Sequence, residues 1–481
     1  MQENIDGKFL SLYRFVKDNH NTSDFIRFFD FLTIKIYLLA TGRGSYTPAR
    51  MHYKLKLKIT QDFVYALGLL VRSVIKSKLS KPFGCVILVY EPSHLSQALG
   101  LGDYVKKYNP IYITTKKNYV KVIQERIKGS NVVFIPNAPK IAALFKKGQV
   151  TDLFNQYGIT IPETKAADVS GMMNEIYHTY SVTKFFFNSI VNSSKIKFSY
   201  IFNDLTFTGR AIAELSSKKG IKSFYIMHGL LSDEFIENLH ICDNYLVFGD
   251  YVRNILSVKE GIQNQQVYTI GAPYLSYYLQ LQEPEIFNVE VKNKVPQGKK
   301  VALVLLSGPG HSVSPQHHRS IIETIKEAIK EKSDSFYFIF KLHPKDSINN
   351  FSSLFEDDTL SRNFGLYEFN KLGNKETIFD WLKIADVVIT GASTTALEGM
   401  YMNKPIVTLD LMHGFDNDTL FITEGATYHC TSKEELLVAM NYLEEHNFRT
   451  KGKADEMSKN YFSDASRLNA FYSDVMDKLI A

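Results

Sequence analysis

Residues 387–399, VVITGASTTALEG, contain the pattern that decides the fold. The first four are apolar or β-branched and predict a short buried strand, and Ser393 is a natural N-cap for the helix that follows. A helix N-terminus offers N–H groups and a partial positive charge, and the hydroxyls of Ser393, Thr394 and Thr395 add donors. The stretch therefore predicts a phosphate site, with Glu398 one turn along near ribose hydroxyls. A capped helix without a ligand is the alternative.

The same alternation of short apolar strands and helices continues on both sides of this unit. In the second half of the chain we expect strands at 301–306, 336–342, 387–390 and 406–409, and helices at 321–331, 378–384 and 395–402. In the first half we expect strands at 85–90, 112–114, 132–135, 199–203, 223–227 and 245–248. Such alternation predicts parallel sheets with helices on both faces.

A polar stretch with two prolines, residues 280–300, separates the two series and predicts a linker. We therefore expect an α/β fold of the GT-B type, in which two Rossmann-like, doubly wound domains face a central cleft and a helical region precedes them. The predicted division is a helical N-terminal region at 1–80, an acceptor domain at 81–280, a linker at 281–300, a nucleotide-sugar donor domain at 301–455 and, at 456–481, a helix that packs back on the first domain.

Polar motifs follow the predicted strands of the second half, where ligands of such folds bind. The strand at 301–306 runs into a glycine-rich turn whose N–H groups suit an anion, although a plain turn is the alternative. The strand at 336–342 ends in a basic His-Pro sequence that suits a phosphate, although a surface turn is the alternative. The candidate donor-binding residues are Ser307, Gly308, Gly310, His311, Lys341, His343, Pro344, Ser393, Thr394, Thr395 and Glu398.

The first half supplies the candidate catalytic acids. Asp204 follows a predicted strand and can act as a general base or a nucleophile, or can simply cap the next helix. His228 also follows a strand, with Asp233 close behind as a rival base. His343 is a candidate acid that protonates a leaving group.

These motifs resemble those of a known group of enzymes. His343-Pro344 and Ser393-Thr394 are similar to the HP and S-S/T motifs of bacterial GT-B sialyltransferases and capsule-type Kdo transferases, in which both bind the CMP of a CMP-sugar donor. His228-Gly229 and the tail at 461–467 resemble capsule and teichoic-acid polymerases that use CDP-glycerol. The resemblance covers residues 200–470. The acidic D/E-D/E-G motif of the sialyltransferases is absent from this sequence, which leaves the base open.

Composition and charge limit where the protein can be located and which partners it can bind. The 481 residues are 45% apolar and 22% charged, with a net charge of +6 and three scattered cysteines, which is typical of a globular protein in a reducing cytoplasm. We expect no transmembrane helix and no nucleic-acid partner. Between Lys35 and Lys81 the only acid is Asp62, against ten bases. This segment predicts peripheral contact with an anionic membrane surface or an acidic glycan, with a solvated helix face as the alternative.

A bound metal is not required by these motifs, and we expect no cofactor. Asp416-Asn417-Asp418 fits a DxD pattern, but turn chemistry explains it equally well, and His317-His318 lacks a matching ligand set. Helix N-termini and histidines can stabilise a leaving phosphate without a metal.

The resemblance implies a glycosyltransferase that moves Kdo or sialic acid from a CMP donor to a capsule or lipopolysaccharide acceptor, and this is the first hypothesis. A CDP-glycerol or UDP-sugar transferase of the same fold is the second, and a UDP-sugar epimerase matches the motifs less well. An inert GT-B scaffold in a glycan assembly complex is the alternative of another class.

Overall fold

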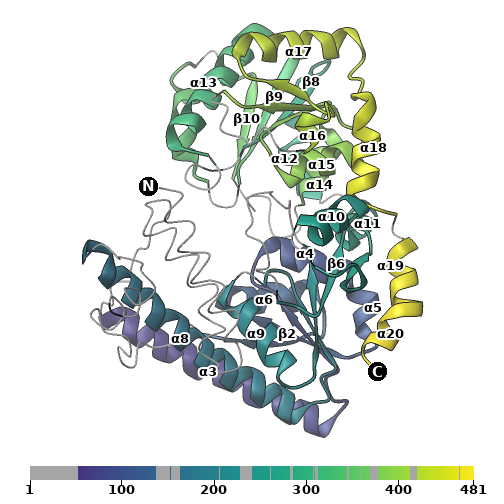
Figure 1. Cartoon of the computed structure of the whole chain (residues 1–481). Helices are drawn as coiled ribbons and strands as arrows, with labels where there is room; N and C mark the ends of the chain where they lie inside the picture. Colours follow the sequence, from purple (N-terminus) through teal and green to yellow (C-terminus); the bar gives the residue numbers. More distant parts are fainter. Residues whose placement is uncertain are drawn as a thin grey trace.

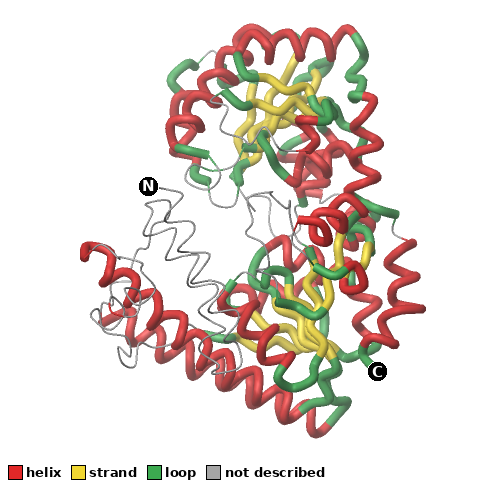
Figure 2. Tube along the Cα trace, in the orientation of Figure 1, coloured by secondary structure: helices red, strands yellow, loops and turns green. Residues whose placement is uncertain are grey.

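The computed structural model consists of two α/β domains stacked along one axis (Figure 1). It describes residues 53–136, 152, 163–204, 206–227, 241–259, 262–281, 285–306, 308, 313–343, 346–358, 360–368, 377–411, 420–464 and 466–481. Helices lie on the outside of both sheets (Figure 2). None of the helices in these ranges is long and apolar enough to cross a membrane.

The first domain is built on a sheet of seven parallel strands in the order β3-β2-β1-β4-β5-β6-β7. The strands are β1 (Cys85–Leu88), β2 (Pro110–Thr114), β3 (Asn131–Phe134), β4 (Phe198–Ile201), β5 (Lys222–Ile226), β6 (Asn244–Val247) and β7 (Val267–Thr269). The connecting helices are α4 (Pro92–Gly100), α5 (Gly102–Lys106), α6 (Lys117–Arg126), α8 (Glu163–Ser193), α9 (Phe207–Ser217), α10 (Asp250–Asn254), η1 (Ile255–Lys259), η2 (Asn264–Gln266) and α11 (Pro273–Leu279). The chain leaves the sheet after β3 and returns on the other side of β1, so the topological switch lies between β1 and β4.

The second domain repeats this plan with six parallel strands in the order β10-β9-β8-β11-β12-β13. The strands are β8 (Lys300–Leu305), β9 (Phe336–Lys341), β10 (Phe364–Tyr367), β11 (Val387–Thr390), β12 (Ile406–Leu409) and β13 (Tyr428–Cys430). The helices are α13 (Pro315–Lys332), η4 (Ile348–Phe355), α14 (Ile378–Ile384), α15 (Thr394–Tyr401), α16 (Leu420–Thr423) and α17 (Lys433–Glu445). Here the switch lies between β8 and β11.

A long helix precedes the first sheet, as expected for the described part of the N-terminal region. The helix α3 (Tyr53–Leu79) runs beside α8, and together they form an arm at the lower left of Figure 1. The Ser77 hydroxyl donates to the Ser193 carbonyl at 2.8 Å, and the rings of Phe63 and Phe186 meet edge to face. The arm is therefore a packed pair of helices.

The segment expected to be a linker has structure of its own. It contains α12 (Glu285–Glu290) and η3 (Lys292–Lys294), and Phe287 is fully buried. The Phe287 ring packs edge to face against Trp381 of α14, with the ring centroids 5.0 Å apart. The polar residues that predicted a linker therefore surround an apolar anchor, which attaches the segment to the second domain.

The C-terminal segment crosses from the second domain to the first (Figure 1). It consists of α18 (Gly452–Tyr461), α19 (Ser466–Ala470), η5 (Phe471–Val475) and α20 (Met476–Leu479). At the crossing, a Cβ on Gly249 would lie 2.2 Å from the Asn460 carbonyl oxygen, so only glycine fits there. Beyond it, Arg467 forms an ion pair with Asp250 at 2.8 Å. The tail therefore ties the two domains together.

Candidate functional site

The carboxyl ends of β8, β9 and β11 bring most of the predicted donor-binding loops to one edge of the second sheet. Because β8 lies between β9 and β11, the loops that follow these three strands are neighbours. A Cβ on Gly308, after β8, would lie 3.3 Å from the side chain of Asp346, after β9. The two loops are thus in contact at the place where ligands bind in open α/β sheets.

The turn after β11 has the cap that its sequence predicts. The Ser393 hydroxyl accepts a hydrogen bond from the Thr395 N–H at 3.2 Å and lies 3.2 Å from the Thr395 hydroxyl. Both side chains and that of Thr394 are half-buried. The predicted capped helix is therefore present, with three hydroxyl-bearing residues around its N-terminus.

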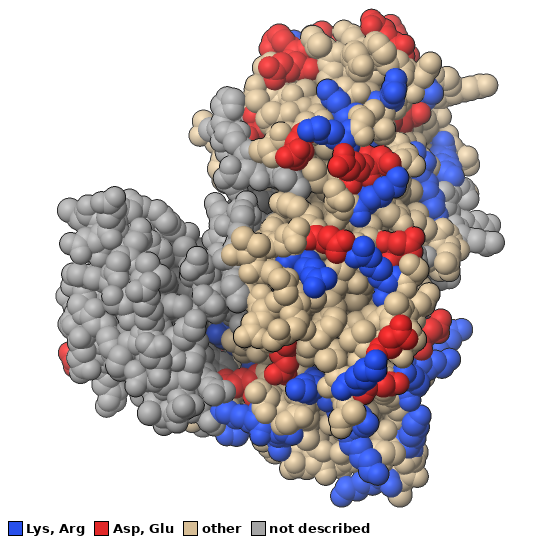
Figure 3. Space-filling view, turned by 45° about the vertical axis from the view of Figure 1, so that its right-hand side comes forward, with Lys and Arg blue, Asp and Glu red and all other residues tan. Residues whose placement is uncertain are grey.

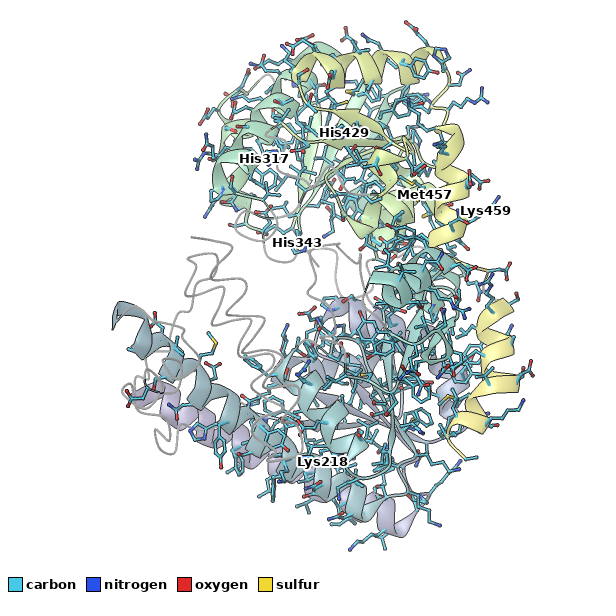
Figure 4. All side chains as sticks on the ribbon, in the orientation of Figure 1. Lys218, His317, His343, His429, Met457 and Lys459 are labelled. Atoms are coloured by element: carbon cyan, nitrogen blue, oxygen red, sulfur yellow. The ribbon has the colours of Figure 1, made fainter. Side chains whose placement is uncertain are left out.

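His343 follows β9 and lies at the lower edge of the second domain, on the side that faces the first (Figure 4). Its carbonyl accepts a hydrogen bond from the Asp346 N–H at 2.9 Å, which closes a turn. Lys341 is buried, and its ammonium group donates to the Glu368 carbonyl at 3.4 Å and lies over the Trp381 ring. The ammonium group of Lys341 thus interacts with groups of its own domain in this conformation.

Glu398 lies at the contact between the domains. Its Oε1 accepts a hydrogen bond of 2.7 Å from the hydroxyl of Tyr274, which belongs to α11 of the first domain. The carboxyl is buried, and burial raises the pKa of Glu398 to about 7 against the opposing effect of the Tyr274 hydrogen bond. Contact of Glu398 with ribose stays a prediction, because in this conformation the carboxyl is bound to a tyrosine.

A buried histidine fixes the loop that carries His343. His318, on the first turn of α13, has its Nε2 3.3 Å from Oδ2 of Asp346, and both side chains are buried. Burial alone would raise the pKa of Asp346, but His318, Asn350 and the Ser347 N–H together lower it below its ordinary value. A carboxylate held in this way anchors the start of the loop after β9 to a helix.

His317 contacts a carboxylate in the loop after β12 in the same way. The Nε2 of His317 lies 3.5 Å from Oδ1 of Asp410, and both side chains are buried. Burial lowers the pKa of His317 and the Asp410 carboxylate opposes this shift. The two histidines that have no metal-ligand pattern therefore each contact one carboxylate at the carboxyl edge of the sheet.

Asp204 is fully buried at the carboxyl end of β4. Its Oδ2 accepts a hydrogen bond from the Ile241 N–H at 3.0 Å. A carboxylate without exposed area is held inside the domain, where it orders the start of the segment that leads into β6. A catalytic role for Asp204 stays a prediction and would require this segment to move.

Several of the predicted residues lie outside the described residues. They are the catalytic candidates His228 and Asp233, the donor-binding candidates Ser307, Gly310, His311 and Pro344, and the DxD sequence at 416–418. Among the residues that are described, no group of three or more His, Cys, Asp or Glu side chains is placed to hold a metal ion.

The structure adds three residues that sequence patterns did not single out. They are Tyr274, Asp346 and Asp410, and each contacts a residue far away in the chain. Asp346 stands three residues after His343, and Asp410 directly follows an apolar strand, so both fit the rule that polar residues at strand ends are candidates. The partner of Tyr274 could not be inferred from spacing, because 124 residues separate it from Glu398.

Comparison with known proteins shows similarity of fold only. No protein-family model and no curated protein sequence matches this chain. Its structure is similar to that of a UDP-GlcNAc 2-epimerase from Methanocaldococcus jannaschii in complex with UDP-GlcNAc and UDP, at 16% identity and a TM-score of 0.55, over 81% of this chain and 98% of that one. It is also similar to a glycosyltransferase from Rickettsia africae, at 14% identity and a TM-score of 0.50, over 83% and 99%.

A third similar structure is a variant of the wall teichoic acid polymerase TagF, at 11% identity and a TM-score of 0.50, over 88% of this chain and 98% of that one. The two parallel sheets and their stacked domains match these proteins over most of their length. The predicted GT-B fold is therefore confirmed.

The raised pKa of Glu398 predicts a pH-dependent stability. Between pH 4.5 and about 7 the folded state holds a proton that the unfolded chain has released, so stability falls as the pH rises through this interval. Because Glu398→Gln keeps the shape and cannot ionise, the wild type should lose about 2–3 kcal/mol relative to this variant between pH 5 and 8. Urea unfolding of both proteins across this range measures the difference.

The matched control is Glu434→Gln, which removes an exposed carboxyl on α17. Its stability should follow that of the wild type at every pH. Equal pH slopes for the wild type and Glu398→Gln would show that the carboxyl at the domain contact is not the titrating group.

Proposed function

We propose that this protein is a glycosyltransferase that moves a sugar from a nucleotide-activated donor to a surface-glycan acceptor. The observation that carries the proposal is that the His343 loop and the capped N-terminus of α15 lie at the same edge of the second sheet, with His343 on the side that faces the other domain (Figure 4). A helix N-terminus, hydroxyls and a histidine are groups that bind and stabilise a phosphate. The GT-B neighbours support the proposal, since one is named a glycosyltransferase and one was solved with UDP-GlcNAc.

The roles of the residues follow from where charge develops. When the bond between the anomeric carbon and the phosphate oxygen breaks, negative charge grows on the departing nucleotide. We assign the stabilisation of that charge to His343 and the N-terminus of α15, which lie at the same edge of the sheet. The acceptor hydroxyl forms the new bond to the anomeric carbon and gives its proton to a base from the first domain, for which Asp204, His228 and Asp233 remain the candidates.

For the donor we propose a CMP-sugar, Kdo or sialic acid, which is transferred to a lipid-linked capsule or lipopolysaccharide acceptor. The support is the pair of motifs His343-Pro344, after β9, and Ser393-Thr394, after β11. A UDP-sugar or CDP-glycerol donor fits the same phosphate-binding groups and is the alternative that nucleotide binding tests.

Calorimetric titration of the full-length protein with CMP, CDP, UDP and GDP, without added metal, tests the donor site. We expect CMP to bind most tightly and His343→Ala to weaken it at least tenfold, because a hydrogen bond to a charged group contributes about 1.5–3 kcal/mol. His446→Ala removes an exposed histidine of the C-terminal end of α17 and should bind CMP like the wild type.

Each other outcome points to a different conclusion. A preference for UDP or CDP keeps the fold and the site and replaces the CMP donor. Unchanged CMP binding by His343→Ala contradicts the role of this residue. Binding of no nucleotide contradicts the proposed function and favours an inert scaffold.

A second candidate is sugar epimerisation, which the similarity to UDP-GlcNAc 2-epimerases favours, with TM-scores of 0.52 and 0.55 for two of them. An epimerase changes its nucleotide sugar without an acceptor, whereas a transferase needs one. Incubation with UDP-GlcNAc alone therefore separates the two reactions, and formation of a 2-epimer would decide for the second.

We also propose that the arm formed by α3 and α8 rests on an anionic membrane surface. Four apolar side chains at helical spacing on α3 are exposed to solvent, namely Val64, Val71, Ile75 and Leu79. Arg72, Lys76, Lys78 and Lys81 are exposed along the same stretch. Figure 3 shows Lys and Arg side chains gathered at the lower end of this domain. Apolar groups flanked by bases suit the headgroup region of a bilayer.

Sedimentation with lipid vesicles tests this contact. Vesicles rich in phosphatidylglycerol should bind the wild-type protein, and Ile75→Ser with Leu79→Ser should weaken that binding at least tenfold, because two apolar side chains that would enter the bilayer are lost. Vesicles of phosphatidylcholine should bind weakly. Val438→Ser, which changes an exposed apolar residue of α17 in the other domain, is the matched control. Equal binding by all three proteins would contradict the contact.

A further inference from the structure

A pocket of about 210 Å³ lies at the carboxyl edge of the first sheet. Its lining comes from the segments after β1, β2, β3 and β4 and from one face of α8. The lining residues are Tyr90, Thr115, Ile135, Pro136, Glu175, Thr179, Thr206, Phe207 and Thr208. Tyr90 and Thr206 follow β1 and β4, so the pocket spans the topological switch of this domain. Its volume is below the roughly 300–1,000 Å³ of most small-molecule sites, which fits a ligand the size of one sugar ring.

One wall of the pocket is fixed by hydrogen bonds. The Tyr90 hydroxyl donates to the Thr206 hydroxyl at 2.9 Å, and that oxygen donates to the Asn203 carbonyl at 3.0 Å. It also accepts from the Gly209 N–H at 3.3 Å and so caps α9. These two hydroxyls hold each other and the helix end in place, so the wall is ordered before any ligand arrives.

Three further hydroxyl groups of the lining are available to a ligand. Within the described part of the chain, the hydroxyls of Thr115, Thr179 and Thr208 make no hydrogen bond. Thr208 is more than nine-tenths buried, so the pocket is where its hydroxyl can find a partner. A ligand with hydroxyl groups of its own offers the Thr208 hydroxyl a hydrogen-bond partner in the pocket.

Two features of the lining specify the kind of ligand. The Glu175 carboxylate accepts hydrogen bonds from hydroxyl groups and repels anions, so it opposes a phosphate or carboxylate at the end of α9. The Phe207 ring and the aliphatic Ile135 and Pro136 offer apolar surface for C–H groups. A neutral sugar ring has hydroxyl groups for the carboxylate and an apolar C–H face for the Phe207 ring, so it meets both requirements.

We infer that this pocket binds a neutral sugar residue of the acceptor glycan, with Thr208 and Glu175 as the groups that recognise its hydroxyls. The inference rests on the proposed function for the identity of the ligand as an acceptor. The saccharide chemistry rests on the pocket itself. The Glu175 carboxylate can accept a hydrogen bond from an acceptor hydroxyl at the carboxyl edge of the sheet. Glu175 is therefore also a candidate for the residue that orients the acceptor.

Saturation-transfer NMR on the full-length protein tests the pocket directly. The probes are the methyl glycosides of glucose, galactose and N-acetylglucosamine, with glycerol 3-phosphate as an anion. We expect at least one glycoside to bind. Thr208→Val and Glu175→Gln should each weaken it tenfold or more, while Thr208→Ser, which keeps the hydroxyl, and the distant Glu434→Gln should stay within twofold of the wild type.

Titration of the same variants with CMP and UDP separates this inference from the proposed function. Nucleotide binding should be unchanged in all of them, because the pocket lies in the other domain. If the protein binds a nucleotide but no glycoside, the inference about the pocket is wrong and the proposed donor site is unaffected. The same holds if the substitutions at Thr208 and Glu175 do not change glycoside binding. Glycoside binding at these residues without any nucleotide binding keeps the pocket as a saccharide site and overturns the transferase.

Discussion

Parallel pairing of the strands is the constraint on which the rest of this structure depends. Every strand pair in both sheets is parallel, so the loops that follow the strands of one domain all emerge at one edge. At each sheet the chain reverses its direction of growth once, between β1 and β4 and between β8 and β11. The crevice that forms at such a reversal collects polar residues from distant parts of the sequence. The loops proposed to bind the donor and the pocket proposed to bind a sugar lie at these two places.

The two edges work together only while the domains keep a defined relation, and two kinds of contact maintain it. A buried hydrogen bond joins Tyr274 to Glu398, and the C-terminal segment passes Gly249 closely before Arg467 pairs with Asp250. The first contact is sensitive to pH, since burial raises the pKa of the carboxyl to about 7. The second depends on shape, since the crossing leaves no room for a side chain. Together they connect the chemistry of one domain to the position of the other.

Local patterns in the sequence predicted ten of the thirteen strands and missed the short strands β7, β10 and β13. They predicted contacts between distant residues poorly. The strands β11 and β12 have the bounds that their apolar runs indicate, and Ser393 caps α15 as its residue type predicts. These features depend on neighbours in the chain. The helix inside the expected linker was missed because its single anchor, Phe287, is recognisable only beside Trp381. For the same reason the hydrogen bond between Tyr274 and Glu398, which are 124 positions apart, could not be predicted from local patterns. The contact of Glu398 with ribose stays a prediction.

We propose that the carboxyl edge of the second sheet binds a nucleotide. Hydrogen–deuterium exchange of the full-length protein, with and without saturating CMP or UDP, is the first measurement to make because it reports where a ligand binds. We expect slower exchange at residues 391–396, around the N-terminus of α15, and at 341–343, at the end of β9, with little change in α17. Slower exchange confined to other segments, or no change with any nucleotide, would contradict it.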